Sequence, residues 1–151
     1  VMKKRPDVIL RVIADKQPEF QGMLNERLDF VQWSPETEVE SLQSMTVGIM
    51  PLLDTLWERG KCSFKMLQYM ACGLPVVVSP VGMNAQILSL GEVGFAATSQ
   101  NEWIDALLSI LSASDEEREI MGSVGRYIVE KYFSIDVIGP TLAKLLKGLA
   151  P

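Results

Sequence analysis

The sequence predicts an α/β fold in which a parallel β-sheet carries helices on both faces. Three observations favour this class. Short aliphatic runs alternate with segments of helical periodicity along the 151 residues. One of these runs, Val76-Val77-Val78-Ser79, is apolar on both faces, as central strands of a parallel sheet are. The last third of the chain consists of consecutive helical patterns.

Five segments are predicted as strands, because each is a short run rich in aliphatic or aromatic side chains. They are residues 8–13, 28–33, 47–52, 76–79 and 94–97. Ligands of such sheets bind beyond the carboxyl ends of the strands. The loops of interest are therefore residues 14–27, 32–34, 51–63 and 79–85.

Helices are predicted between these strands from capping signals. The first begins near Ser34, which is a candidate N-cap. The second covers residues 63–72 and stops at Gly73, because glycine readily ends a helix. A short helix is predicted over residues 84–88, whereas residues 53–61 are expected to form a loop.

The C-terminal third is predicted to form amphipathic helices, with candidate N-caps at Ser99, Ser114 and Ser134. Their apolar residues recur at helical spacing. The three stripes are Trp103, Ala106, Leu107, Ile110 and Leu111; Met121, Val124, Ile128 and Tyr132; and Ile135, Ile138, Leu142, Leu145 and Leu149. The chain is therefore expected to end in helices.

Composition excludes several classes of function. A net charge of −5 argues against a nucleic-acid partner, which would require a basic surface. The sequence contains no histidine, so it holds neither a Ser-His-Asp triad nor a His-ligated metal site. No apolar run is long enough to span a bilayer, and the first residues do not lead into a signal peptide. We therefore expect a cytoplasmic protein without a transmembrane segment.

The segment from Gly60 to Ser79 carries most of the chemical information. A loop leads into a helix N-terminus at the carboxyl end of a strand, where free backbone amides and the helix dipole favour an anion such as a diphosphate. Lys65 can add a charged contact, and Gln68 lies one turn further along the same face. Local chemistry alone fits equally a plain amphipathic helix with both side chains in solvent.

Three phrases carry a resemblance to a known family. They are Gln68-Tyr69-Met70-Ala71-Cys72-Gly73-Leu74-Pro75-Val76-Val77, Ser79-Pro80-Val81-Gly82 and Gly91-Glu92-Val93-Gly94-Phe95. Together they resemble the C-terminal, nucleotide-sugar-binding domain of the group 1 glycosyltransferases, which have the GT-B fold of two facing Rossmann-like domains. The resemblance extends from Val8 to about Leu149. It implies that residues 1–151 are part of this Rossmann-like domain and lack its first strand and helix.

The resemblance also implies a function. The full enzyme would transfer a sugar from a nucleotide-diphosphate sugar to an acceptor hydroxyl with retention, without a cofactor or a required metal. A separate N-terminal domain would bind the acceptor, so the fragment alone is expected to be inactive. Lys65 would stabilise the departing diphosphate. The expected substrate-binding residues are Gly60, Lys61, Ser63, Phe64, Lys65, Gln68 and Trp33.

Two positions depart from the family pattern and leave alternatives open. Gln68 stands where the family has the glutamate assigned to the ribose, and Gly60 stands where it has the glutamate associated with the donor sugar. Glu58 can replace the latter if the loop shifts. Trp33 fits a packing role as well as contact with the base. A non-catalytic, degenerate domain, a nucleotide-sugar epimerase and a flavodoxin-like receiver are the alternative interpretations.

Overall fold

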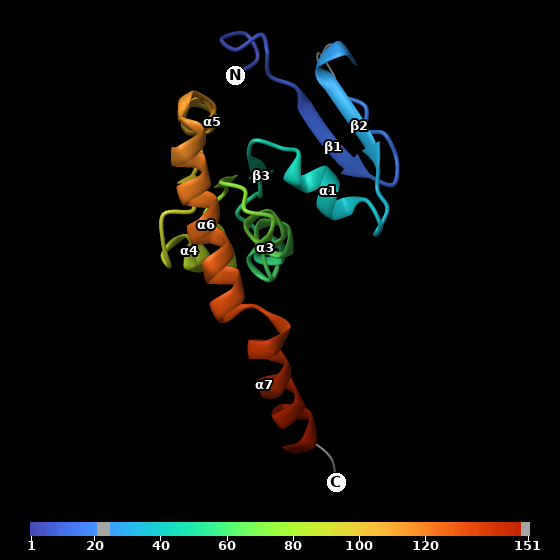
Figure 1. The fold of residues 1–151 in the computed structure, drawn as a ribbon, viewed down its shortest axis with the longest axis vertical. Coiled ribbons are helices and arrows are strands. Elements are labelled where there is room, and N and C mark those ends of the chain that lie inside the picture. The colour runs from blue at the N-terminus through green and yellow to red at the C-terminus, as the bar shows by residue number, and fades with distance from the viewer. Residues whose placement is uncertain (21–24, 149–151) are drawn as a thin grey trace.

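The computed structural model describes residues 1–20 and 25–148. It confirms the α/β class, with parallel strands flanked by helices and helices at the C-terminal end (Figure 1). The strands are β1 (Leu10–Ala14), β2 (Leu28–Gln32), β3 (Gly48–Met50), β4 (Val76–Val78) and β5 (Gly94–Ala96). The helices are η1 (Asn25–Arg27), α1 (Glu38–Gln43), α2 (Leu56–Arg59), α3 (Phe64–Ala71), α4 (Met83–Leu88), α5 (Gln100–Ser112), α6 (Asp115–Tyr132) and α7 (Ile135–Gly148). Leu149, the end of the predicted domain at residue 151 and residues 21–24 of the predicted loop 14–27 lie outside the described residues.

The strands form two parallel sheets rather than one. β1 pairs with β2, and β3, β4 and β5 form a second sheet in that order. Figure 1 shows the first pair standing apart from the body of the molecule. A strand pattern predicts which segments are extended, but it does not predict which strands pair with one another.

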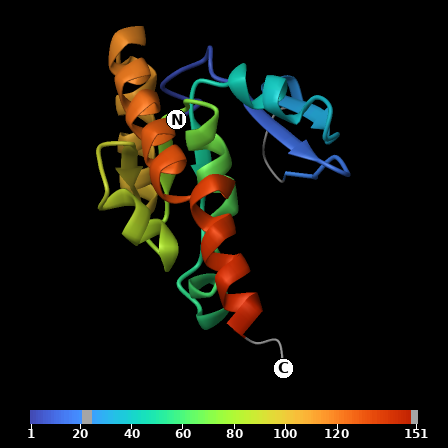
Figure 2. The ribbon, with the colours of Figure 1, turned by 60° about the horizontal axis from the view of Figure 1, so that its bottom comes forward.

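The core is built around β4, the central strand of the larger sheet. Its three valines have 0% exposure, which confirms the predicted buried strand. Helices α3, α4 and α6 cover one face, and α5 covers the other (Figure 2). The first face buries Met66, Met70, Ile87 and Ile128 against Val76 and Val78, and the second buries Ala97, Ala106 and Ile110 against Val77. The larger sheet therefore has helices on both faces, as predicted.

Two local predictions were wrong. Helix α1 begins at Glu38 with Thr37 as its N-cap residue, because the Ser34 hydroxyl donates to the Glu36 carboxylate at 2.7 Å rather than capping a helix. The predicted loop 53–61 contains the short helix α2. There the Thr55 hydroxyl accepts a hydrogen bond from the Glu58 amide at 3.2 Å and thereby caps the first turn.

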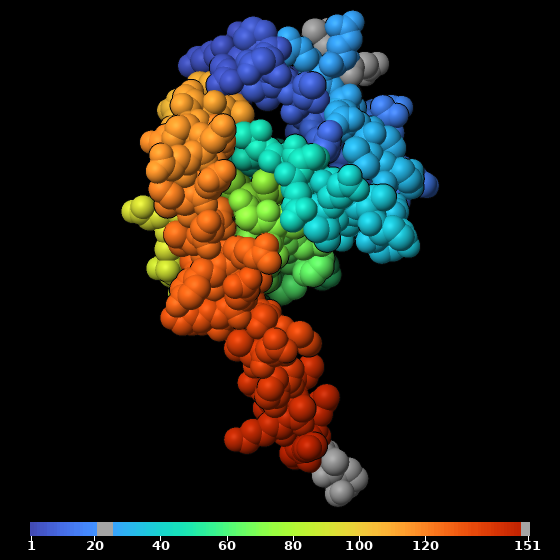
Figure 3. Space-filling view, in the orientation of Figure 1, coloured from blue at the N-terminus to red at the C-terminus, as the bar shows by residue number. Residues whose placement is uncertain are grey.

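The C-terminal helices begin where their serines predicted. Ser99 and Ser114 each form a capping box with the glutamate three residues later. Helix α7 is amphipathic, as predicted, but no described residue of it is buried. Figures 1 and 3 show it extending away from the rest of the chain. Its apolar stripe is therefore uncovered.

Candidate functional site

Polar contacts join the loops that follow β3 and β4. The Leu52 amide donates to the Ser79 hydroxyl at 2.9 Å, and the Asn84 side-chain amide donates to the Ser79 carbonyl at 3.0 Å. Ser79 and Asn84 are both buried. These bonds fix the start of the loop that leads to α3 relative to the turn that leads to α4.

The turn after β4 also supports helix α2. Gly82 has a φ of 57°, and a Cβ atom there would lie 2.6 Å from the Arg59 carbonyl oxygen. Only glycine permits this close approach of two backbones. The last turn of α2, whose C-cap residue is Gly60, is thus held against the turn at the carboxyl end of β4.

Helix α3 begins without a cap. Ser63 occupies the N-cap position in a left-handed conformation, with φ 56° and ψ 27°, and its side chain makes no capping bond. The first helical bond runs from the Leu67 amide to the Ser63 carbonyl at 3.0 Å. Within the described residues, the amides of Phe64, Lys65 and Met66 therefore have no hydrogen-bond acceptor. This arrangement suits an anion.

A carboxylate joins two of the predicted site residues. The Glu38 Oε1 atom accepts a hydrogen bond from the Trp33 indole at 3.0 Å and lies 4.0 Å from the Lys65 ammonium. Trp33 follows β2, Glu38 opens α1, and Lys65 lies in the first turn of α3. The structure thus brings Trp33 and Lys65 close together. Sequence reasoning missed Glu38, because no local pattern indicates its contact with α3.

The neighbouring cations are held more tightly than Lys65. Arg59 donates to both carboxylate oxygens of Asp54, at 2.6 and 2.9 Å, and this contact lowers the pKa of Asp54. The Lys61 ammonium lies 2.6 Å from the Glu58 carboxylate. The Lys65 side chain is 55% exposed, and its distance of 4.0 Å from Glu38 is at the limit of an ion pair. Lys65 is therefore the cation of this segment most able to reorient toward a ligand.

The remaining predicted residues lie on the same stretch of chain. Gly60 is the C-cap residue of α2 and has an ordinary φ of −81°. Phe64 is exposed, and Gln68 is half-buried in the second turn of α3. Glu58, the alternative to Gly60, has its carboxylate engaged by Lys61. The roles assigned to these residues stay predictions.

The described part of the chain contains neither a metal-binding group of side chains nor a membrane-spanning helix. No group of three or more histidine, cysteine, aspartate or glutamate side chains in residues 1–20 and 25–148 could hold a metal ion. Over the same residues, no helix combines the length and the apolarity needed to cross a membrane.

Comparison with known proteins identifies the family. The family model described as "Glycosyl transferases group 1" matches residues 1–113, which is most of the chain. No curated protein matches the sequence. The matched region includes the whole segment from β1 to α5 and every residue of the candidate site. The chain therefore belongs to the group 1 glycosyltransferases.

Proposed function

We propose that this chain is the donor-binding domain of a retaining glycosyltransferase. The full enzyme moves a sugar from a nucleotide-diphosphate sugar to an acceptor hydroxyl, and a second GT-B domain holds the acceptor. The observation that carries the proposal is the uncapped N-terminus of α3 beside Lys65, in a chain that belongs to this family. A helix start with free amides and a nearby cation is suited to a diphosphate.

In this proposal the site acts on the leaving group. As the bond from the anomeric carbon to the diphosphate breaks, negative charge accumulates on the diphosphate oxygens. The amides of Phe64, Lys65 and Met66 donate to these oxygens, and the Lys65 ammonium turns from Glu38 toward them. Fixed donors aimed at developing charge lower the barrier, because they need little reorganisation during the reaction.

The rest of the donor is assigned to residues around this helix. Gln68, one turn beyond Lys65, binds a ribose hydroxyl through its amide, which can both donate and accept. Trp33 borders the base, with its indole oriented by Glu38. No metal is required in this scheme, since the helix terminus and Lys65 supply the positive charge.

A second candidate function is favoured by two residues of the same site. Gly60 has no side chain and Gln68 has no charge, at the two positions where the family has glutamates. A degenerate domain that binds a nucleotide without catalysing transfer fits this observation. The two candidates differ in one measurable property, which is sugar transfer by the full enzyme in the presence of a bound donor.

The donor site is tested by calorimetric titration with UDP, GDP and ADP, first without metal and then with Mg²⁺. We expect one nucleotide to bind preferentially. Lys65→Ala should weaken it about fivefold, corresponding to about 1 kcal/mol for an exposed charged contact. Glu38→Gln should strengthen binding about twofold or more, because it removes the carboxylate that competes for Lys65. Lys147→Ala, in the protruding helix α7, is the matched control and should change nothing. An unchanged affinity in Lys65→Ala would disprove the diphosphate role.

A further inference from the structure

Three large apolar side chains are exposed between the end of β3 and the end of α2. Leu53 is 77% exposed, Leu56 87% and Trp57 80%. Single exposed apolar residues are common on protein surfaces, but three within one short segment form a patch of the kind that marks a binding surface. Leu53, Leu56 and Trp57 are called the α2 patch below.

The α2 patch lies next to the proposed donor site. It follows the carboxyl end of β3, which is where the ligands of parallel sheets bind. Arg59, the last residue of α2, comes four residues before Ser63, so the chain limits the distance between their Cα atoms to about 14 Å. Ser63 is the N-cap residue of α3, where the diphosphate is proposed to bind. Figure 2 shows α2 at the lower end of the main body, below α3.

Contacts around α2 hold the patch in one conformation. The Arg59 guanidinium donates to both carboxylate oxygens of Asp54, at 2.6 and 2.9 Å, and so joins the two ends of the segment. The Thr55 hydroxyl caps the helix, and the backbone of Arg59 lies against Gly82. A surface that is already fixed loses little conformational entropy when a ligand binds. The α2 patch is therefore preformed.

The charges beside the patch neutralise one another. Asp54 is paired with Arg59, and the Glu58 carboxylate lies 2.6 Å from the Lys61 ammonium. An anionic bilayer surface attracts basic residues that are free to contact it, whereas Arg59 and Lys61 are both paired. The surroundings of the patch therefore favour an uncharged ligand over a bilayer.

The hydrogen-bonding groups beside the patch are also engaged. The Thr55 hydroxyl accepts from the Glu58 amide at 3.2 Å, and the carboxylates of Asp54 and Glu58 are held by their cations. A carbohydrate bound here would leave hydroxyl groups without protein partners, which is costly. A hydrocarbon chain has no such requirement, and it gains free energy by leaving water.

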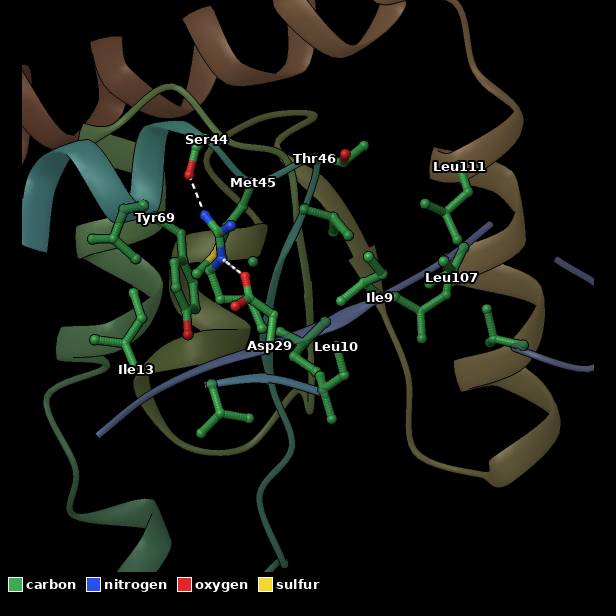
Figure 4. Close-up of a pocket in the computed structure, with 18 of the residues that line it drawn as sticks. Ile9, Leu10, Ile13, Asp29, Ser44, Met45, Thr46, Tyr69, Leu107 and Leu111 are labelled. Carbon is green, nitrogen blue, oxygen red and sulfur yellow. Dashed lines mark hydrogen bonds and ion pairs between the residues drawn. The ribbon is translucent and has the colours of Figure 1, made fainter. Parts of the chain in front are cut away.

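The α2 patch is distinct from the aliphatic cavity of the fold. Figure 4 shows Ile9, Leu107 and Leu111 at this cavity of about 820 Å³, which residues of β1, α5 and the segment around β3 line. The Arg11 guanidinium at its wall pairs with Asp29 at 2.6 Å. No residue of the α2 patch lines this cavity. The patch is thus a separate surface on the ligand side of the larger sheet.

We propose that the α2 patch binds the hydrocarbon portion of the acceptor, which is accordingly a hydroxyl-bearing molecule with an apolar chain. The acceptor hydroxyl lies at the donor sugar beside α3, and the chain extends from there over Leu53, Leu56 and Trp57. The second domain binds the remainder of the acceptor. This inference rests on the proposed function, because the acceptor must reach a sugar that the donor site holds.

The test uses butyl, hexyl and octyl β-glucoside, which combine hydroxyl groups with a hydrocarbon chain of chosen length. Each is titrated below its micelle concentration, and NMR follows the Trp57 indole and the Leu53 and Leu56 amides. A CH₂ group that is half-buried on the patch should tighten binding about twofold, so octyl glucoside should bind about 15-fold more tightly than butyl glucoside. Equal affinities for the three glucosides would overturn the proposal.

Variants of similar exposure locate the bound chain. Leu56→Ser and Trp57→Ala should each weaken octyl glucoside binding at least about threefold, since each removes apolar contact area. Ile135→Ser is the matched control, because Ile135 of α7 is 79% exposed, and it should leave the response at α2 unchanged. Loss of binding in Ile135→Ser but not in the α2 variants would place the chain on α7 and contradict the proposal.

Nucleotide binding, measured on the same sample, separates this inference from the proposed function. Nucleotide binding without any response to the glucosides would refute the acceptor contact alone. Glucoside binding in a chain that binds no nucleotide would refute the donor site and, with it, the acceptor role of the patch. Octyl glucoside should remain bound when the nucleotide is added, and its displacement would place the chain in the donor site instead.

Two other occupants of the patch give different results. In the full enzyme the Trp57 indole should still respond to octyl glucoside. A response in residues 1–151 alone would show that the second domain covers the patch, and the proposal would be wrong. A response to phosphatidylcholine vesicles without one to octyl glucoside would assign the patch to a bilayer, which also contradicts the proposal.

Discussion

The contact between α6 and the turn after α3 predicts that replacing a glycine of α6 by alanine lowers the stability of the chain, although alanine favours a helix. Gly122 lies in α6 and is buried. A Cβ atom at this position would lie 2.7 Å from the carbonyl carbon of Gly73 and closer still to its oxygen. Both neighbours are backbone atoms, which cannot turn aside as a side chain can. Gly122→Ala must therefore move the helix or the turn.

The magnitude follows from two opposing effects. Alanine favours a helix interior over glycine by about 1 kcal/mol, so an isolated helix would gain stability from this change. Ordinary Cβ contacts begin at 3.4 Å, so the two backbones must separate by at least 0.7 Å, which is the difference between 3.4 and 2.7 Å. That movement opens the contact between α6 and α3, where Met70 and Ile128 are fully buried. Overpacking of this kind costs about 3 kcal/mol, so the free energy of unfolding should fall by about 2 kcal/mol.

Urea denaturation followed by circular dichroism measures this change, and Gly125→Ala in the same helix is its matched control. A Cβ atom at Gly125 would meet the Met70 side chain at 3.3 Å, and a methionine side chain can adjust. The control should lie within about 1 kcal/mol of the unsubstituted chain. A Gly122→Ala chain as stable as the control would show that the close backbone contact does not exist in solution.

Two further predictions concern the donor site and pH. Gly60→Glu should be accommodated, because φ is −81° and the nearest atom to a new Cβ lies 3.5 Å away. It should raise the rate of sugar transfer by the full enzyme, and a measured rate that does not change would place Gly60 outside the donor-sugar site. The pKa of Glu102 is lowered from its ordinary 4.5 by hydrogen bonds from the Ser99 and Thr98 amides. The stabilisation from this capping box is therefore complete above pH 4.5 and disappears as pH falls through the lowered value. The difference in unfolding free energy between the chain and Glu102→Gln should accordingly shrink between pH 7 and pH 3, and a constant difference would contradict the capping role.

Features set by neighbouring residues were predictable from the sequence. The valines of β4 form an uninterrupted apolar run, and such a run has few alternatives to a buried parallel strand. Gly73 ends α3 with a φ of 76°, which few other residues adopt. Ser99 and Ser114 are each followed three residues later by a glutamate, so their capping boxes depend only on local sequence.

Features set by distant residues were not predictable in this way. The division into two sheets depends on which strands lie side by side, and a strand pattern does not specify its partner strand. The contact of Glu38 with Lys65 requires α1 and α3 to be adjacent in space, and its contact with Trp33 depends on where α1 begins. The uncovered stripe of α7 has the same periodicity as the covered face of α5, so periodicity alone does not reveal which helix is packed.

The three serines at helix starts give the strongest physical argument for the candidate site. Ser99 and Ser114 adopt extended conformations and satisfy a backbone amide of their helices. Ser63 adopts the left-handed conformation, which costs an L-residue about 1–2 kcal/mol, and it satisfies none. Met66 stands where the other two helices have the glutamate of the capping box, so α3 lacks both halves of that motif. Stability alone would favour a capped start to α3, whereas an anion bound there would satisfy the amides and offset the cost of the uncapped start.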